Sequence, residues 1–388
     1  MKTALNKEIN IVEKYDWVDA LRGYAILLVI LIHSSQTFYV DSFIKKIADS
    51  GYLGVQLFFI MSSFTLFKSY NNRLNYNSAN IIRNFFIRRV FRIAPYYYSA
   101  GLIYVFYKII LKGNSVSFIN LLANFTFTNG IYLPAINDIP RGGWSVGIEM
   151  LFYFTLPLLI KICNSLKKTF VVFIITLLFS IFINQYQISV IASYINAFWN
   201  DLDASVFYYW LPNQLPIFIL GIILYYIHKE IQFNIFIGYL FLTSSMCFYF
   251  LFCFWKPDIV TNWFKLNSEY IVSIIFVFFT IGIYSTKNKL VLNKIILKFG
   301  QISFSLYLNH FLVINFISYL FNGFLKFLNI YLVLPKKLIN NNFVFMIMFV
   351  LVLFLSYLVS QFTYKAIELK GQRAGEYLIK RLNNKVNI

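Results

Sequence analysis

Long apolar runs alternate with short polar segments along the whole chain of 388 residues. Each run approaches the roughly 20 apolar residues that an α-helix needs to cross a bilayer. The runs occupy residues 18–39, 52–70, 94–111, 145–163, 169–187, 207–228, 235–254, 268–285, 303–321 and 343–365. Two shorter apolar stretches, 117–133 and 188–199, are predicted to be re-entrant or to lie along the membrane interface. The pattern therefore predicts an all-α polytopic membrane protein with about ten transmembrane helices.

The composition agrees with this fold class, because hydrophobic residues make up 59% of the chain and charged residues only 13%. The mean hydropathy is +0.67. A net charge of +19 would suggest nucleic acid as the partner of a soluble protein. In a membrane protein, however, Lys and Arg first mark the cytoplasmic side. With the N-terminus inside, the cytoplasmic segments hold 23 of the 34 Lys and Arg residues, which predicts that both termini are cytoplasmic.

We expect a single transmembrane domain, with a core over about residues 16–368 and a basic, amphipathic cytoplasmic tail over 369–388. The N-terminus is polar and the loops are short, so neither a cleavable signal peptide nor an appended soluble domain is expected. The three cysteines lie in or beside apolar runs, and the three histidines are scattered. Neither a disulfide framework nor a metal site is therefore expected, and no nucleic-acid partner.

An arginine and a histidine lie eleven residues apart in the first apolar run, at Arg22 and His33. Eleven residues turn a helix through three circuits plus about 20° and raise it by roughly 16 Å, so the two side chains share one face. Ionisable groups at such depth cost several kcal/mol unless they face a polar interior. They predict a functional site, with Asp19 one turn earlier helping to shape it. Snorkelling of Arg22 and a carbonyl partner for His33 are the structural alternative.

Four arginines precede the third apolar run, between Arg83 and Pro95. Arg89 and Arg92 are helix neighbours at i, i+3, so they are predicted to form a fixed cationic cleft at the cytoplasmic face. Arginine grips phosphate bidentately, which indicates a phosphate-rich ligand. Pro95 fixes the start of the third span and with it the shape of the cleft. An anchor to anionic lipid headgroups is the alternative.

A third polar group, with Trp144, Ser145 and Glu149, begins the fourth apolar run. Glu149 lies about one and a half turns, and His33 about two turns, from the outer ends of their runs, so the two are predicted to share a depth. A carboxylate beside a histidine fixes the tautomer and raises the basicity of the imidazole, as hydroxyl activation requires. We therefore predict that His33 and Glu149 are catalytic. A structural pairing of Glu149 with Arg22 or another cation is the alternative.

Polar side chains also enter the ninth apolar run, between Gly300 and His310. Ser303, Tyr307 and His310 share one helical face at i, i+4 and i+7. A polar stripe in a membrane helix generally lines a cavity, which makes this face a further part of the predicted site. Hydrogen bonding between helices is the alternative explanation for the same residues.

The four groups, in this order, resemble the motifs of the acyltransferase type 3 family, bacterial membrane proteins that O-acetylate surface polysaccharides and related acceptors. The resemblance extends from Asp16 to about Leu378. The matching residues are Arg22 and His33, then Arg89, Arg92 and Pro95, then Trp144, Ser145 and Glu149, and finally Ser305, Tyr307 and His310. One departure follows the last span, where the family often has a Glu-x-Pro-Gly-like sequence. Here Lys370 stands in place of the proline, between Glu368 and Gly371.

The resemblance implies an acyl-CoA donor, usually acetyl-CoA, that is reached from the cytoplasm. It also implies a carbohydrate acceptor outside, such as O-antigen lipopolysaccharide, capsule or exopolysaccharide, including lipid-linked forms. We accordingly interpret the chain as a multi-pass O-acyltransferase of the bacterial cytoplasmic (inner) membrane, surrounded by membrane lipids and using no metal. Donor binding is assigned to Arg22, Arg89, Arg92, Ser305, Tyr307 and His310, and site shaping to Asp19, Pro95, Trp144 and Ser145.

Two mechanisms and two other function classes stay open at the level of the sequence. His33 either acts as a general base during direct transfer or accepts the acetyl group and passes it on. A proton-coupled transporter is the main alternative function, because Arg, His and Glu within membranes also build proton relays. A flippase-like accessory protein or a scaffold is the other. Binding and slow hydrolysis of acetyl-CoA by the purified protein would separate an acyltransferase from both.

Overall fold

The computed structural model describes residues 15–75, 80–187, 208–255, 267–331 and 342–386, and this part of the chain is helical without any β-strand. The predicted interfacial stretch 188–199 lies outside the described residues. The long helices are α2 (Asp16–Ser35), α4 (Gly54–Asn75), α5 (Ile81–Phe106), α7 (Trp144–Ile162), α8 (Leu166–Gln187), α10 (Leu211–Glu230), α11 (Ile235–Phe254), α13 (Ser268–Thr286), α15 (Ser303–Tyr331), α17 (Asn342–Thr363) and α18 (Leu369–Val386). The shorter helices are α3 (Ser42–Asp49), α6 (Phe118–Phe125) and α14 (Lys294–Gln301). Two π-helical segments, Tyr107–Leu111 and Tyr364–Glu368, follow α5 and α17.

Nine helical segments of the described residues are long and apolar enough to cross a membrane. They coincide with nine of the ten predicted runs, and the run 235–254 has the same bounds as α11. The predicted run 94–111 falls on α5 and the π-helical segment after it. α5 carries arginines in its first half and several tyrosines in its second, which lowers its mean hydropathy. The all-α fold is confirmed, whereas the number of ten spans stays a prediction.

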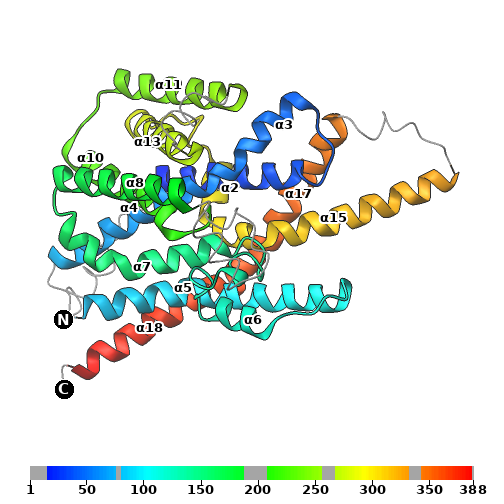
Figure 1. The fold of residues 1–388 in the computed structure, drawn as a ribbon, viewed down its shortest axis with the longest axis horizontal. Helices are drawn as coiled ribbons and strands as arrows, with labels where there is room; N and C mark the ends of the chain where they lie inside the picture. Colours follow the sequence, from blue (N-terminus) through cyan, green and yellow to red (C-terminus); the bar gives the residue numbers. More distant parts are fainter. Residues whose placement is uncertain (1–14, 76–79, 188–207, 256–266, 332–341, 387–388) are drawn as a thin grey trace.

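Several long helices, among them α5, α7, α10 and α11, run close to the horizontal direction of Figure 1, whereas α17 and α18 cross the view obliquely; α2 lies in the middle of the bundle. α2 packs against α4, α14 and α15, while α4 packs against both α2 and α7. Large side chains fill the spaces between the helices. The rings of Phe152 and Phe218, for example, stack with their centroids 4.1 Å apart between α7 and α10. A bundle of this kind satisfies the backbone polar groups within each helix and buries apolar surface between helices.

The predicted interfacial stretch 117–133 forms α6 and the turns that follow it. Asn124 ties this segment to the bundle, because its Oδ1 accepts a hydrogen bond from the Tyr97 hydroxyl at 3.2 Å and its Nδ2 donates to the carbonyl of Ala135 at 3.1 Å. The buried Asn side chain thus satisfies non-helical backbone, which the interior of a membrane protein requires. The segment leads into the loop before α7, which carries part of the site.

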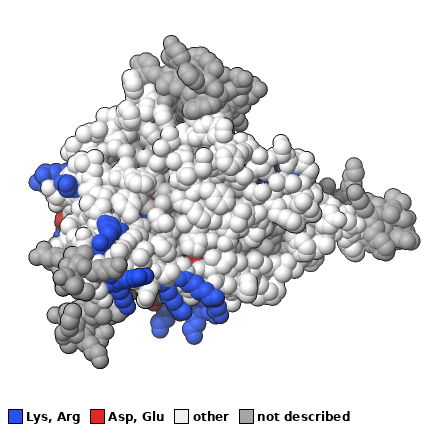
Figure 2. Space-filling model, turned by 90° about the horizontal axis from the view of Figure 1, so that it is seen from below, with Lys and Arg blue, Asp and Glu red and all other residues white. Residues whose placement is uncertain are grey.

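Most Lys and Arg side chains visible in Figure 2 gather toward one end of the molecule. In Figure 1, the same end holds the start of α5 and the end of α18. We expect this end to face the cytoplasm, because positive loops are retained inside. Reporter fusions after Lys168 and Lys298 should then read as cytoplasmic, and fusions near Asp201 and Lys336 as external, with paired fluorescent and periplasm-active reporters as the measurement. An external signal at Lys168 would contradict this orientation.

Candidate active site

A basic cleft of about 430 Å³ opens between α2, α4, α5 and α18. The lining includes Arg89 and Arg92, the two arginines of α5 that the sequence places in a cationic cleft. The other charged side chains of the lining are Asp19, Arg22, Arg73, Arg88 and Glu376. Arginine therefore dominates the lining, and a guanidinium is the side chain best suited to hold phosphate.

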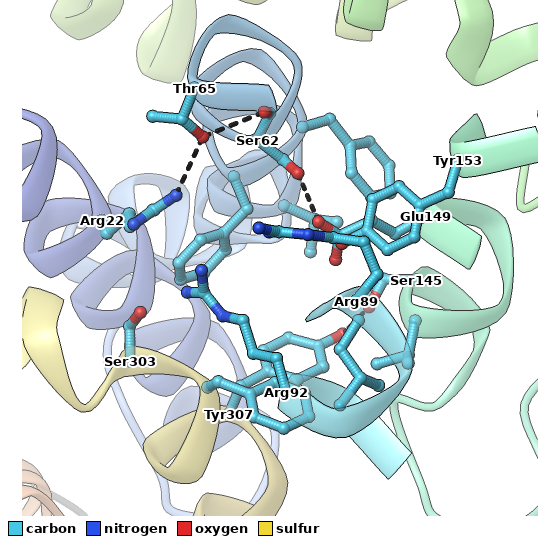
Figure 3. Close-up of a pocket in the computed structure, with 16 residues that line it drawn as sticks. Arg22, Ser62, Thr65, Arg89, Arg92, Ser145, Glu149, Tyr153, Ser303 and Tyr307 are labelled. Carbon is cyan, nitrogen blue, oxygen red and sulfur yellow. Dashed lines mark hydrogen bonds between the residues drawn. The ribbon is translucent and has the colours of Figure 1, made fainter. Parts of the chain in front are cut away.

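The inner chamber is a smaller cavity of about 90 Å³ in the middle of the bundle, with room for only a few water molecules. Figure 3 shows polar side chains that converge on it from five helices. They are Arg22 of α2, Ser62 and Thr65 of α4, Arg89 and Arg92 of α5, Ser145, Glu149 and Tyr153 of α7, and Ser303 and Tyr307 of α15. Three arginines and one carboxylate line this chamber, which gives it a net positive charge.

The outer cavity has a volume of about 630 Å³ and lies beyond the inner chamber, at the end of α2 that carries His33. The polar residues of its lining are His33, Gln36, Asp49, Asn137 and Arg141, and the aromatic ones are Tyr52, Trp144, Tyr208, Tyr209, Tyr307 and Phe311. Aromatic faces beside hydrogen-bonding groups make this cavity suitable for a ligand that is apolar on its faces and polar at its edges.

The three cavities lie in series through the bundle, because neighbouring cavities share lining residues, and we call this series the path. The basic cleft and the inner chamber share Arg22, Thr65, Arg89 and Arg92. The inner chamber and the outer cavity share Val55 and Tyr307. Arg22 therefore lies where the cleft meets the chamber, between the two ends of the path. Over the described residues, no group of His, Cys, Asp and Glu side chains is arranged to hold a metal ion.

His33 is held in a defined orientation at the outer cavity. Its Nδ1 lies 3.1 Å from Oε1 of Gln36, one helical turn further on. With the Gln36 amide in this orientation, its oxygen accepts, and the tautomer that fits carries its proton on Nδ1 and keeps the lone pair of Nε2. The imidazole also packs against the ring of Phe311, with centroids 4.2 Å apart, and against that of His310, at 5.3 Å. This is the arrangement that a proton-accepting or nucleophilic histidine requires.

Glu149 lies in the inner chamber and faces hydroxyl groups and arginines. Its carboxylate accepts a hydrogen bond from Ser62 Oγ, as Figure 3 shows. Arg22 donates to Thr65 Oγ1 at 3.3 Å, on the same face of α4 as Ser62. Among the described residues that line the chamber, the carboxylate of Glu149 is the only acidic group, and it shares the lining with Arg22, Arg89 and Arg92.

The predicted pairing of Glu149 with His33 is wrong, because the two side chains line different cavities and have different partners. α4 is the reason, since it packs against both α2 and α7 and supplies Ser62 to the carboxylate. His33 on α2 and Glu149 on α7 were predicted to share a depth, but the two helices do not bring these side chains together. The alternative, in which Glu149 faces cations, agrees with its place among the arginines.

The sequence model of one protein family, described as "Acyltransferase domain", matches residues 15–361 of the chain. That range covers the inner chamber, the outer cavity and all of the basic cleft except the part that α18 supplies. The chain belongs to the acyltransferase type 3 family. No solved structure matches the chain.

Several bacterial proteins resemble this acyltransferase chain. The protein named "Putative O-acetyltransferase SACOL0978" from Staphylococcus aureus (strain COL) is 24% identical over 336 residues, which are 79% of this chain and 52% of that protein. "Peptidoglycan O-acetyltransferase OatA" of Listeria monocytogenes is 26% identical over 153 residues, 36% of this chain and 23% of that protein. The chain thus spans about half the length of the Staphylococcus aureus relatives that it matches.

The last motif of the acyltransferase family lies on α15, and Tyr307 is its member at the boundary between the inner chamber and the outer cavity. The Tyr307 hydroxyl accepts a hydrogen bond from Ser145 Oγ at 2.9 Å and donates to the carbonyl of Gly142 at 3.0 Å. α15 is thereby fixed to α7 and to the loop before it. Ser303, on the same face, lines the chamber as the predicted polar stripe requires.

Ser305 and His310, also assigned to donor binding, line none of the three cavities. Ser305 follows Ser303 by two residues, about 200° around the helix, so it points away from the chamber. Its Oγ donates to Glu368 Oε2 at 3.0 Å. His310 is fully buried and packs against His33, at the opposite end of the path from the basic cleft. The structure therefore does not support a direct donor contact for either residue.

Three of the four residues assigned to site shaping line the path, and Pro95 lines none of the three cavities. Asp19 lines the basic cleft, and Ser145 lines the inner chamber. Trp144 lines the outer cavity, with its ring 4.7 Å from that of Tyr209. Pro95 lies inside α5 without ending the helix, one turn after Arg92. Their roles stay predictions.

Sequence reasoning missed Ser62 and Thr65, which form the wall of the chamber on α4, and Arg73 of the basic cleft. The polar sequence Ser62-Ser-Phe-Thr65 in the middle of an apolar run was the available signal. Glu368 was also missed as a functional candidate, although it is a carboxylate in a family motif. The Glu368 side chain is only 2% exposed.

Proposed function

We propose that the protein is an integral membrane O-acyltransferase that moves an acyl group, in the simplest case acetyl, from cytoplasmic acyl-CoA to a hydroxyl of an extracytoplasmic carbohydrate such as O-antigen, capsule or exopolysaccharide. The path of three cavities carries this proposal, because it joins a basic cleft to a histidine-lined cavity through a chamber of about 90 Å³. Family membership and the names of the relatives support O-acetyl transfer. The bacterial source of these relatives supports placement in the cytoplasmic membrane.

The basic cleft suits the nucleotide end of acyl-CoA, which carries a pyrophosphate and a 3′-phosphate. Arg88, Arg89 and Arg92 lie on one side of α5 and offer planar donors to these groups. The pantetheine arm is uncharged and narrow. From the cleft it would pass Arg22 and place the thioester in the inner chamber, where a guanidinium stabilises developing negative charge on the carbonyl oxygen.

The outer cavity suits a sugar acceptor. Trp144, Tyr208 and Tyr209 present aromatic faces, while Gln36 and Asn137 present amide groups. Sugar rings have apolar faces and hydroxyl edges, so they pack on aromatic side chains and exchange hydrogen bonds with amides. His33 in the same cavity would then lie next to an acceptor hydroxyl.

In direct transfer, Nε2 of His33 takes the proton from the acceptor hydroxyl while the hydroxyl oxygen bonds to the thioester carbonyl carbon. The carbon–sulfur bond breaks, and the proton ends on the thiolate of CoA. In the two-step route, Nε2 bonds to the carbonyl carbon, the carbon–sulfur bond breaks, and the proton of Nδ1 ends on the thiolate, so that a neutral acetyl-imidazole and the thiol of CoA result. The hydroxyl oxygen then takes the acetyl group, the carbon–nitrogen bond breaks, and the hydroxyl proton returns to the imidazole. Both routes balance without a metal or a redox partner.

The test is to incubate the purified protein in detergent with radiolabelled acetyl-CoA, with and without surface glycan from a bacterial host. We expect saturable binding, slow hydrolysis without an acceptor and transfer of the label to the glycan. A proton-coupled transporter would neither bind nor hydrolyse acetyl-CoA. Absence of both would therefore overturn the proposal and favour the transporter.

Donor affinity is expected to depend on Arg89 and Arg92. Each charge-assisted contact contributes roughly 1.5–3 kcal/mol, so Arg89→Ala and Arg92→Ala should each raise the dissociation constant for acetyl-CoA about tenfold or more. Lysine should restore it only in part, because it keeps the charge and loses the planar fork. The measurement is equilibrium binding of labelled acetyl-CoA in detergent.

Arg83→Ala is the matched control for this experiment, because Arg83 lies on the same helix but donates to Asn383 at 2.5 Å and lines none of the three cavities. A lipid anchor would behave differently. Lysine would then serve as well as arginine at 89 and 92, and abundance would change rather than affinity. Unchanged affinity in all of these variants would remove the donor assignment of the cleft.

A further inference from the structure

α18 is seated on α5 through two glycines, Gly371 and Gly375, one helical turn apart. A Cβ atom on Gly371 would lie 2.6 Å from the carbonyl oxygen of Phe91 and 2.7 Å from Pro95 Cγ. A Cβ atom on Gly375 would lie 2.7 Å from Phe91 Cβ. Only glycine permits so close an approach, and such small-residue seams are typical of helix pairs in membrane proteins. The seam fixes the rotation of α18 about its own axis.

That rotation turns the next residue after each glycine toward the basic cleft. Gln372 and Glu376 are one helical turn apart on the same face, and both line the cleft together with the arginines of α5. The cleft thus has two unlike walls. One wall carries guanidinium groups that suit phosphates, and the other carries an amide and a carboxylate.

The amide of Gln372 is held in place by a buried carboxylate. Gln372 Nε2 donates to Glu368 Oε1 at 3.3 Å, and the other oxygen of Glu368 accepts from Ser305 Oγ at 3.0 Å. Glu368 lies in the π-helical segment between α17 and α18, a feature often found at functional sites. Of the Gln372 amide, the carbonyl oxygen and one N–H stay available to a ligand.

We propose that Gln372 and Glu376 recognise the adenine base of the donor nucleotide, a proposal that rests on acyl-CoA being the donor. A glutamine amide pairs with the edge of adenine by accepting from the 6-amino group and donating to N7. The Glu376 carboxylate accepts the second hydrogen of the same amino group. A base with an oxygen at this position, such as guanine, would place that oxygen against the carboxylate and be rejected.

The assignment also gives a role to Ser305, which lines none of the cavities: its hydroxyl holds Glu368, and Glu368 holds the amide of Gln372. Ser305 and Glu368 are positioning residues in this scheme, because they touch Gln372 or its carboxylate partner and not the donor. Recognition of adenine would also allow the protein to distinguish acyl-CoA from acyl donors that lack a nucleotide base. An acyl group on a carrier protein or an acyl phosphate would leave the α18 wall of the cleft without a ligand.

The experiment compares two probes with identical phosphates, adenosine 3′,5′-bisphosphate and guanosine 3′,5′-bisphosphate, as competitors of labelled acetyl-CoA on the full-length protein in detergent. We expect the adenosine compound to bind about tenfold more tightly, as a bidentate base contact implies. Gln372→Ala should weaken only the adenosine compound. Glu376→Gln should strengthen the guanosine compound, because an amide can donate to the oxygen of guanine.

Tyr377→Ala is the matched control, since Tyr377 lies on the outward face of α18, is 69% exposed and does not line the cleft. It should leave both affinities unchanged. Equal binding of the two probes to the parent protein would overturn the proposal, and so would equal weakening of both by Gln372→Ala. Binding of labelled acetyl-CoA to the parent protein is measured first. If the parent protein binds none, the proposed function itself fails, and this result is distinct from a failure of the adenine proposal.

Discussion

His33→Ala should abolish acyl transfer while the protein stays inserted and abundant. His33 is the titratable side chain of the outer cavity whose partner, Gln36, leaves Nε2 ready to take a proton or an acyl group. Loss of a general base alone lowers rates about 100- to 10,000-fold, and loss of a nucleophile at least as much. The measurement is transfer of labelled acetyl to surface glycan in membranes, normalised to protein abundance.

His228→Ala provides the matched control for this loss of an imidazole. The His228 ring packs against Tyr15 and Trp17, with centroids 5.5 Å apart in each case, and lines none of the three cavities. We expect this variant to retain most of its activity. If His33→Ala retained more than a few per cent, the assignment of His33 as a catalytic residue would have to be abandoned.

Glu149→Gln is expected to lower the transfer rate by orders of magnitude, for a reason that differs from the one the sequence suggested. Glu149 is the carboxylate that the lining of the inner chamber sets against Arg22, Arg89 and Arg92. Removing the charge of Glu149 leaves three partly buried guanidinium groups without the carboxylate of the chamber. The arginines should then shift from the positions that the thioester requires.

Two measurements on Glu149→Gln separate this electrostatic role from a direct action on His33. Thermal stability in detergent should fall together with activity, because the partly buried arginines of the chamber lose a nearby negative charge. Glu149→Asp should recover part of both, since it keeps the charge with a shorter reach. A variant with an almost unchanged rate and stability would show that the carboxylate has neither role.

The fold was largely predictable because the apolar runs determine which segments form membrane helices. The spacing of Arg22 and His33 was also informative, because the relative direction of these two side chains depends only on the geometry of one helix. The same holds for Arg89 and Arg92, which share the basic cleft as predicted. Within one helix, the sequence alone specifies which side chains share a face.

Contacts between helices were not predictable in the same way. The position of α4 between α2 and α7 separates His33 from Glu149, and no pattern within the apolar runs indicates which helices are neighbours. Ser305 likewise belongs to a matching motif, but its direction on α15 leads to Glu368 instead of the cleft. The seam of α18 depends on a close approach to Phe91. The two glycines allow this approach, but the sequence does not indicate which helix they contact.

The small volume of the inner chamber has a consequence for the energetics of the cell. A cavity of about 90 Å³, lined by large side chains such as Phe58 and Phe59, is too small for a nucleotide and holds only a few water molecules. Its three guanidinium groups would also repel cations that approach from either side. An enzyme of this design would export a two-carbon fragment while the membrane keeps its ion gradients and the coenzyme stays in the cytosol.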